Sequence, residues 1–172
     1  CNPWNPTGRC LSRDELVALD ALVTRYNGRV FEDAIHVPLI LDGTYIPYAT
    51  VSDEAPSHTI TAVAASKGWN IPGLKCAQLI FNNDADWEAF KPHAHAATEP
   101  TSTVGARAAG ICFSTSQEWN DDVRDYLRDN RDLLQARVAE WEGVSMAPVE
   151  GTYITLLDFS ELADRGIFGS AN

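Results

Sequence analysis

The chain has 172 residues, of which 45% are hydrophobic, enough to bury one sizeable core and to form one domain or slightly more. Its 24 acidic residues outnumber its 13 basic ones, giving a formal charge of −11 with no basic tract, so we expect no nucleic-acid partner. No apolar run approaches the roughly 20 residues of a membrane span and no signal peptide opens the sequence, so we expect no membrane partner either.

The four cysteines indicate a reducing compartment. They show no CxxC spacing, and Cys76 and Cys112 lie among apolar residues. Such a pattern is typical of buried free thiols and not of a disulfide framework. The sequence therefore predicts a cytoplasmic protein.

The chain opens with a loop and continues into a helix. Residues 1–9, CNPWNPTGR, read like the middle of a loop and no Met precedes them, so we expect a fragment of a longer protein. The next segment, SRDELVALDALVTRYN, has Ser12 followed by Glu15, the spacing of a capping box, and then apolar residues at helical spacing. It predicts an amphipathic helix.

Three short apolar runs predict strands. They are rich in β-branched and aromatic residues, are bounded by Gly, Pro, Asn or Ser, and read RVFEDAI (29–35), HTITAVAAS (58–66) and CAQLIFN (76–82). Their nearly continuous apolar character predicts that both faces of the sheet are covered.

The second half of the chain is mainly helical. Helices are expected at DADWEAFKPHAHAA (84–97), at TSTVGARAAGICFST (101–115) and from about 117 to 141. After a turn at Pro148, GTYITLLDF (151–159) predicts a strong strand. This order favours an α/β sheet unit over residues 1–118, followed by an interdomain helix and a smaller unit over 119–172.

Lys67 is the first candidate for chemistry. It follows an apolar strand directly before Gly-Trp-Asn, and loops at strand ends often contain the functional groups of open α/β sheets. A lysine held against apolar walls can act as a Schiff-base nucleophile and proton carrier. On position alone, a solvated surface lysine is the commoner case.

Three motifs change this interpretation. NPWNPTGR (2–9), EDAIHVPL (32–39) and ASKGWNIPGLKCA (65–77) occur in register, and with them the chain resembles the class I/II aminotransferase-like enzymes of pyridoxal-phosphate fold type I. Within that group it resembles the branch of cystathionine β-lyases and C–S lyases. The resemblance implies a three-layer α/β/α part of the large domain, followed by the start of a small C-terminal α+β domain. It also implies a pyridoxal 5'-phosphate cofactor, an amino-acid substrate and a homodimer in the parent enzyme.

The resemblance gives roles to four residues. Lys67 matches the lysine that bonds covalently to the cofactor, and Asp33 matches the carboxylate that faces the pyridine nitrogen and keeps it protonated. Asn5 matches the asparagine that hydrogen-bonds the phenolic oxygen of the cofactor. His36 stands where many aminotransferases have a tyrosine and the lyase branch commonly has a histidine. Without the motifs, Asp33 and Asn5 would be turn formers and His36 a packed or surface residue.

The phosphate-binding residues depart from the wider family pattern. Many relatives have Ser or Gly three residues before the lysine and Arg eight residues after it, where this chain has Ala64 and Lys75. Lys75 supplies a cation, but as a point charge without the bidentate fork of arginine. Ser66 could add a hydroxyl. The alternative for Lys75 is an exposed surface lysine.

His93 and His95 do not form a metal site in this interpretation. Residues two apart on a helix point in different directions, and no third ligand is suitably spaced.

The expected function is therefore β-elimination from cysteine-type amino acids, with release of pyruvate and ammonia. An aminotransferase that uses the same Lys67 and Asp33 is the alternative enzyme, and a non-catalytic scaffold is the alternative of another class. Family members are considerably longer, with further residues for the phosphate, the cofactor ring and the substrate carboxylate. We therefore expect the isolated chain to bind the cofactor weakly and to be inactive.

Overall fold

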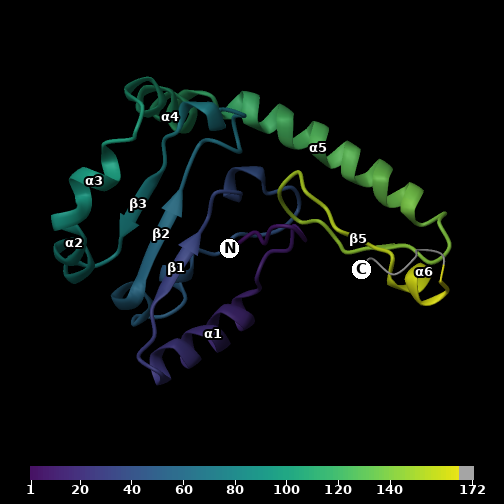
Figure 1. Cartoon of the computed structure of the whole chain (residues 1–172), viewed down its shortest axis with the longest axis horizontal. Helices are drawn as coiled ribbons and strands as arrows, with labels where there is room; N and C mark the ends of the chain where they lie inside the picture. The colour runs from purple at the N-terminus through teal and green to yellow at the C-terminus, as the bar shows by residue number, and fades with distance from the viewer. Residues whose placement is uncertain (167–172) are drawn as a thin grey trace.

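A three-stranded sheet forms the centre of the molecule in the computed structural model, which describes residues 1–166 (Figure 1). Strand β1 (Val30–Asp33) runs parallel to β2 (Thr59–Val63), and β2 runs antiparallel to β3 (Gln78–Phe81). The strand order is β1-β2-β3, so β2 is central. All three predicted strands are confirmed.

Helices precede and follow this sheet, and a second, two-stranded sheet lies near the end of the chain. The remaining elements are α1 (Arg13–Arg25), α2 (Asp84–Phe90), α3 (Ala94–Thr98), α4 (Thr103–Thr115), α5 (Gln117–Val138), β4 (Ser145–Met146), β5 (Leu157–Asp158) and α6 (Ser160–Asp164). Figure 1 shows α5 leading away from the three-stranded sheet towards β5 and α6.

Helix α1 begins where the capping box predicts. Ser12 accepts a hydrogen bond from the Glu15 backbone, and the Glu15 side chain accepts one from the Ser12 backbone. Leu16 of this helix packs with Tyr48, Val51 and Ala55 in a buried cluster, against which Val30 and other apolar side chains pack. This cluster joins α1 to one face of the three-stranded sheet.

A buried carboxylate fixes the long connection between β1 and β2 on that same face. Glu32 accepts hydrogen bonds from the hydroxyls of Tyr45 and Thr61, at 3.0 Å each, and from the Tyr48 backbone at 3.2 Å. Burial and the Glu32 charge both raise the pKa of Tyr45, which keeps its hydroxyl a hydrogen-bond donor. Glu32 therefore ties a loop of more than twenty residues to the parallel strand pair.

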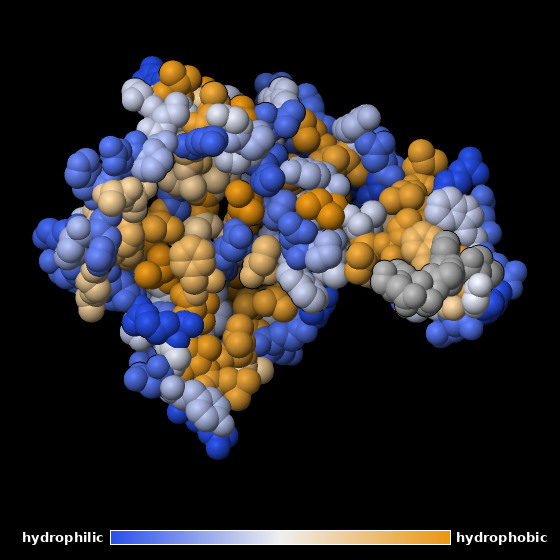
Figure 2. Space-filling view, viewed as in Figure 1, coloured by the Kyte–Doolittle hydropathy of each residue, from blue (hydrophilic) through white to orange (hydrophobic). Residues whose placement is uncertain are grey.

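The opposite face of the sheet is only partly covered, contrary to the expectation that both faces are covered. Trp87 and Phe90 of α2 pack against Phe81 on this face. Phe31 and Leu79 point to this face and are 63% and 41% exposed, and Figure 2 shows hydrophobic residues at the surface over the strands and α1. Within residues 1–166, helical cover on this face is thus limited to α2 at the β3 edge, and a complete second layer of the expected three-layer arrangement is not formed by them. An apolar strand pattern predicts that a face of the sheet is covered, but it does not identify the residues that cover it.

Arginines on one side of α5 fasten it to the loop that follows β1. Arg124 and Arg128 donate to the backbone oxygens of Ile40 and Leu41, and Arg128 also pairs with Asp42. Arg131 pairs with Asp42 as well. Their i, i+4, i+7 spacing places the three guanidinium groups on one side of the helix.

Two expectations for the second half need correction. The segment 151–159 is not a long strand, because Thr152 has a left-handed backbone (φ 68°) and only Leu157–Asp158 pairs with β4. The helix expected over 84–97 is interrupted by a 3₁₀ turn at Lys91–His93, since Pro92 cannot donate its backbone nitrogen to the helix. The helix predicted from about 117 is confirmed as α5.

Three other expectations concern the domain boundary, the cysteines and membrane-spanning helices. The proposed domain boundary at 118–119 falls in the first turn of α5 and stays a prediction. All four cysteines are free; Cys112 is buried as expected, whereas Cys76 is half-buried. No helix in residues 1–166 combines the length and hydrophobicity needed to cross a bilayer.

Replacing Glu32 with alanine is expected to destabilise the protein by about 3 kcal/mol, because three donors, two of them buried, lose their acceptor. Glutamine retains the shape and one accepting oxygen, so Glu32→Gln should cost less. Urea unfolding followed by circular dichroism measures both, with the exposed Asp129→Ala as control. Equal stability of Glu32→Ala and the control would show that this carboxylate does not anchor the loop.

Candidate functional site

The candidate site lies where the two parallel strands end. Asp33 is the last residue of β1, and because β1 and β2 are parallel, the turns that follow them leave the same edge of the sheet. The Asp33 carboxylate accepts a hydrogen bond from the Ile35 backbone at 3.1 Å through Oδ1. One carboxylate oxygen therefore shapes the turn, and Oδ2 has no hydrogen-bond partner among the described residues.

His36 lies in this turn and is almost completely buried, with 2% of its surface exposed. Burial lowers the pKa of its imidazole, the positive charge of Lys67 lowers it further, and the negative charge of Asp33 acts in the opposite direction. The ring is therefore neutral at pH 7. Asp33 and His36 belong to the turn after β1, and Gly68, the neighbour of Lys67, packs against Pro38 of the same turn. We therefore describe Asp33, His36 and Lys67 as a single cluster.

Lys67 is half-buried in the turn that follows β2, and close packing at the next residue sets the position of that turn. A methyl group on Gly68 would lie 2.5 Å from Cβ of Pro38, so only glycine allows the two turns to approach so closely. Asn120 of α5, which is 1% exposed, donates its side-chain amide to the Gly68 carbonyl at 2.9 Å. Trp69 donates its ring N–H to the Ser116 carbonyl at 2.9 Å.

The N-terminal loop that contains Asn5 is attached to the same strand end. The Asn2 backbone donates to the Asp33 carbonyl at 3.0 Å, and a bridge between Trp4 and Arg9 closes the loop around Asn5. Asn5 itself is exposed and has no side-chain hydrogen bond within residues 1–166. The loop is thus anchored beside Asp33, while the Asn5 amide remains available to a ligand.

Ser66 and Lys75 are less well placed by the structure. Ser66 directly precedes Lys67 and is half-buried, whereas Lys75 is exposed in the turn before β3 with a left-handed backbone (φ 49°). Neither side chain makes a hydrogen bond or ion pair with Asp33, His36 or Lys67 in the described part of the chain. The structure does not bring these two residues into the cluster.

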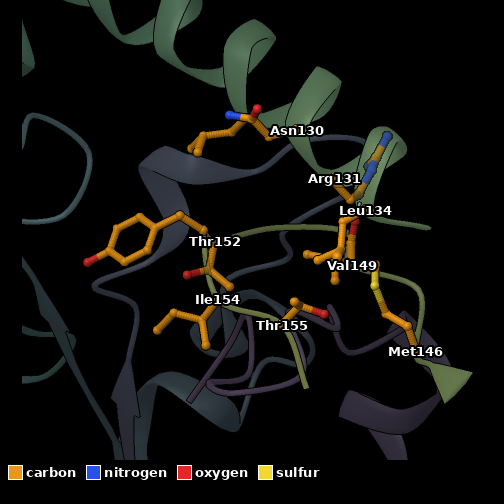
Figure 3. Close-up of a pocket in the computed structure, with 10 residues that line it drawn as sticks. Asn130, Arg131, Leu134, Met146, Val149, Thr152, Ile154 and Thr155 are labelled. Carbon is orange, nitrogen blue, oxygen red and sulfur yellow. Dashed lines mark hydrogen bonds between the residues drawn. The ribbon is translucent and has the colours of Figure 1, made fainter. Parts of the chain in front are cut away.

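A cavity of about 110 Å³ lies between α5 and the chain from Met146 to Thr155 (Figure 3). Thr152 and Tyr153 line it, and both contact His36. Its wall is mainly apolar, with Leu127 and Leu134 from the helix and Val149 opposite them. None of the predicted site residues lines it. Within residues 1–166, no group of three or more His, Cys, Asp or Glu is arranged to hold a metal ion.

The sequence analysis missed the segment 149–152, which closes the site from the C-terminal side. Glu150 accepts from the Cys10 backbone through its side chain and from the Leu41 backbone through its carbonyl. Thr152 Oγ1 lies 2.8 Å from Nδ1 of His36. A glycine before a threonine in an otherwise strand-like run was the available signal that this run is not a regular strand.

The cluster predicts how the pKa of His36 responds to mutation. In the wild-type chain, the pKa of His36 should lie below its ordinary value of about 6.5. Lys67→Gln should raise it, because a positive neighbour disfavours the imidazolium, and Asp33→Asn should lower it. An NMR titration of the imidazole protons measures both. Lys75→Gln is the matched control and should leave the value unchanged; an equal response to the two lysine changes would contradict the cluster.

Known proteins are similar to this chain in both sequence and fold. The family model of aminotransferase class I and II matches residues 1–168. Cystathionine beta-lyase of Corynebacterium glutamicum is 38% identical over 160 residues, which cover 93% of this chain and 43% of that protein. The cystathionine beta-lyase PatB of Bacillus subtilis is 30% identical over 167 residues, 93% of this chain and 42% of that protein.

The fold of a solved structure is also similar to that of this chain. The crystal structure of cystalysin from Treponema denticola, which contains a pyridoxal 5'-phosphate cofactor, superposes with a TM-score of 0.87 at 28% identity, covering 95% of this chain and 42% of that one. The chain therefore spans less than half the length of these relatives. With a family model that matches nearly its whole length, this chain belongs to the aminotransferase class I and II family, in the branch of the cystathionine beta-lyases and C–S lyases.

Proposed function

We propose that this chain provides the catalytic lysine of a pyridoxal-phosphate-dependent lyase that cleaves the carbon–sulfur bond of cysteine-type amino acids. The close packing of the turn that contains Lys67 against the turn after Asp33, at Gly68 and Pro38, is the observation that carries the proposal. It supports the assignment because an amine, an anion and a neutral ring at one sheet edge are the groups this chemistry needs. The choice of a lyase rests on the relatives named cystathionine beta-lyase.

The residues present fit most of the cofactor. The Lys67 amine can bond to its aldehyde carbon, Asp33 can pair with the protonated pyridine nitrogen, and His36 and Asn5 can hydrogen-bond its phenolic oxygen. For the phosphate, Ser66 and Lys75 are the available groups, and Lys75 would supply a point charge without the bidentate fork of arginine. The weak binding expected of the isolated chain stays a prediction.

When bound, pyridoxal phosphate supplies an electron sink for the negative charge that develops at Cα of the substrate. Lys67 takes the Cα proton on Nζ as general base. The Asp33 carboxylate would accept a hydrogen bond from the pyridine N–H and so keep the proton on that nitrogen. Because His36 is neutral, it can hydrogen-bond the phenolic oxygen without adding a positive charge next to Lys67.

The overall reaction balances with water as the only co-reactant. The Cβ–S bond of the substrate breaks, the sulfur leaves as a thiol, and the remaining three-carbon unit is hydrolysed to pyruvate and ammonia. With cystathionine as substrate, the thiol is homocysteine. An aminotransferase would use the same Lys67 and Asp33 but would transfer the amino group to a 2-oxo acid, and enzymes of both names are similar to this chain. The homodimer implied by the resemblance stays part of this proposal.

The whole protein, incubated with cystathionine and a 2-oxo acid, is expected to release pyruvate without matching amino-group transfer. Lys67→Ala should lower kcat at least about 1,000-fold, because it removes the proton carrier. The exposed Lys91→Ala is the control and should behave like wild type. Coupled lactate dehydrogenase measures pyruvate, and amino-acid analysis measures transfer.

Two results would overturn the lyase assignment. Amino-group transfer without pyruvate would establish the aminotransferase alternative. No reaction, together with no absorption change on adding pyridoxal phosphate to the wild-type protein, would establish the non-catalytic scaffold.

A further inference from the structure

Thr152 makes a buried contact with the site from far along the sequence. Its Oγ1 lies 2.8 Å from Nδ1 of His36, across a separation of 116 residues. Thr152 is 1% exposed and His36 is 2% exposed, so the hydrogen bond between them is buried. The contact joins the last part of the chain directly to the turn after β1.

The backbone of Thr152 has an energetically unfavourable conformation. Its φ of 68° lies in the left-handed region, which a β-branched residue rarely adopts and which persists only where the surroundings enforce it. The Thr152 backbone donates to the Leu39 carbonyl at 2.9 Å, and Leu39 follows His36 in the same turn. The neighbouring Gly151 donates to the Gly8 carbonyl, also at 2.9 Å. These bonds place the hydroxyl opposite Nδ1.

The direction of this hydrogen bond follows from the available partners. Among residues 1–166, the Thr152 hydroxyl has no side-chain or backbone acceptor other than His36 Nδ1. A buried hydroxyl that does not donate leaves an unsatisfied hydrogen, which is costly. The hydroxyl therefore donates to Nδ1, and the proton of the neutral ring lies on Nε2.

We propose that Thr152 is a positioning residue that fixes the Nε2–H tautomer of His36, so that the ring presents a hydrogen-bond donor to an anionic oxygen of the bound ligand. The ring also packs edge-to-face with Tyr153, at 6.0 Å between centroids, but Nε2 has no hydrogen-bond partner within the described residues and is the nitrogen left for a ligand. The tautomer is a property of this chain alone. Only the identity of the oxygen, the phenolic oxygen of the cofactor, rests on the proposed function.

Nitrogen NMR tests the tautomer directly, without cofactor. In the 15N-labelled chain, at a pH where His36 is neutral, long-range 1H–15N correlations should show Nδ1 unprotonated and Nε2 protonated. His36→Gln assigns the signals, and the exposed His93 and His95 give the reference for freely exchanging tautomers. A proton on Nδ1, or averaged signals like those of the reference histidines, overturns the inference.

Two variants test the role of the hydroxyl. Thr152→Val removes it with little change of shape and should produce a mixture of tautomers, whereas Thr152→Ser retains it and should give the wild-type spectrum. A wild-type spectrum in the valine variant contradicts the inference. If that variant does not fold, the wild-type and serine spectra still decide, because both must show the Nε2–H form.

Kinetic measurements on the whole protein test whether the tautomer of His36 affects activity. Thr152→Val should lower kcat/KM about tenfold, the size expected for one misdirected hydrogen bond, and Thr152→Ser should recover most of that loss. Equal kcat/KM in the valine variant and wild type would show that the donor at Nε2 is not used. If the wild-type protein releases no pyruvate, the proposed function fails, while the tautomer result stands on its own.

Discussion

The close packing of Gly68 against Pro38 is the constraint on which the candidate site depends. No side chain can be placed on residue 68 without meeting the proline ring, so the turn after β2 lies directly against the turn after β1. Asn120 donates a hydrogen bond to the Gly68 carbonyl and is itself buried. With the two turns in contact, the charges of Lys67 and Asp33 act on the same buried histidine.

Three further features support that contact from different parts of the chain. Glu32 ties the loop after β1 to the covered face of the sheet, and arginines of α5 hold the same loop from outside. The segment 149–152 closes the remaining side through Thr152 and His36. Each is a hydrogen-bonded anchor between segments distant in sequence, so the geometry of the site depends on the whole tertiary structure and not on any one turn.

The sequence predicted those parts of the fold that local patterns encode. The capping box of Ser12 located α1, the apolar runs located the strands, and the motif order pointed to Lys67 and Asp33. Thr152 and Asn120 could not be found in this way, because their importance comes from contacts made only after folding. The strand predicted over 151–159 failed for the same reason: hydrogen bonds to other segments hold Thr152 in a conformation that propensity disfavours.

The dependence of the site on residue 68 can be measured through the coupling between Lys67 and His36. Gly68→Ala should separate the two turns, so that Lys67→Gln changes the pKa of His36 much less in that background than in wild type. Gly73→Ala is the matched control, since a methyl group there meets nothing within 4 Å, and it should leave the coupling intact. The same change of the His36 pKa on Lys67→Gln in the Gly68→Ala and Gly73→Ala backgrounds would contradict this account.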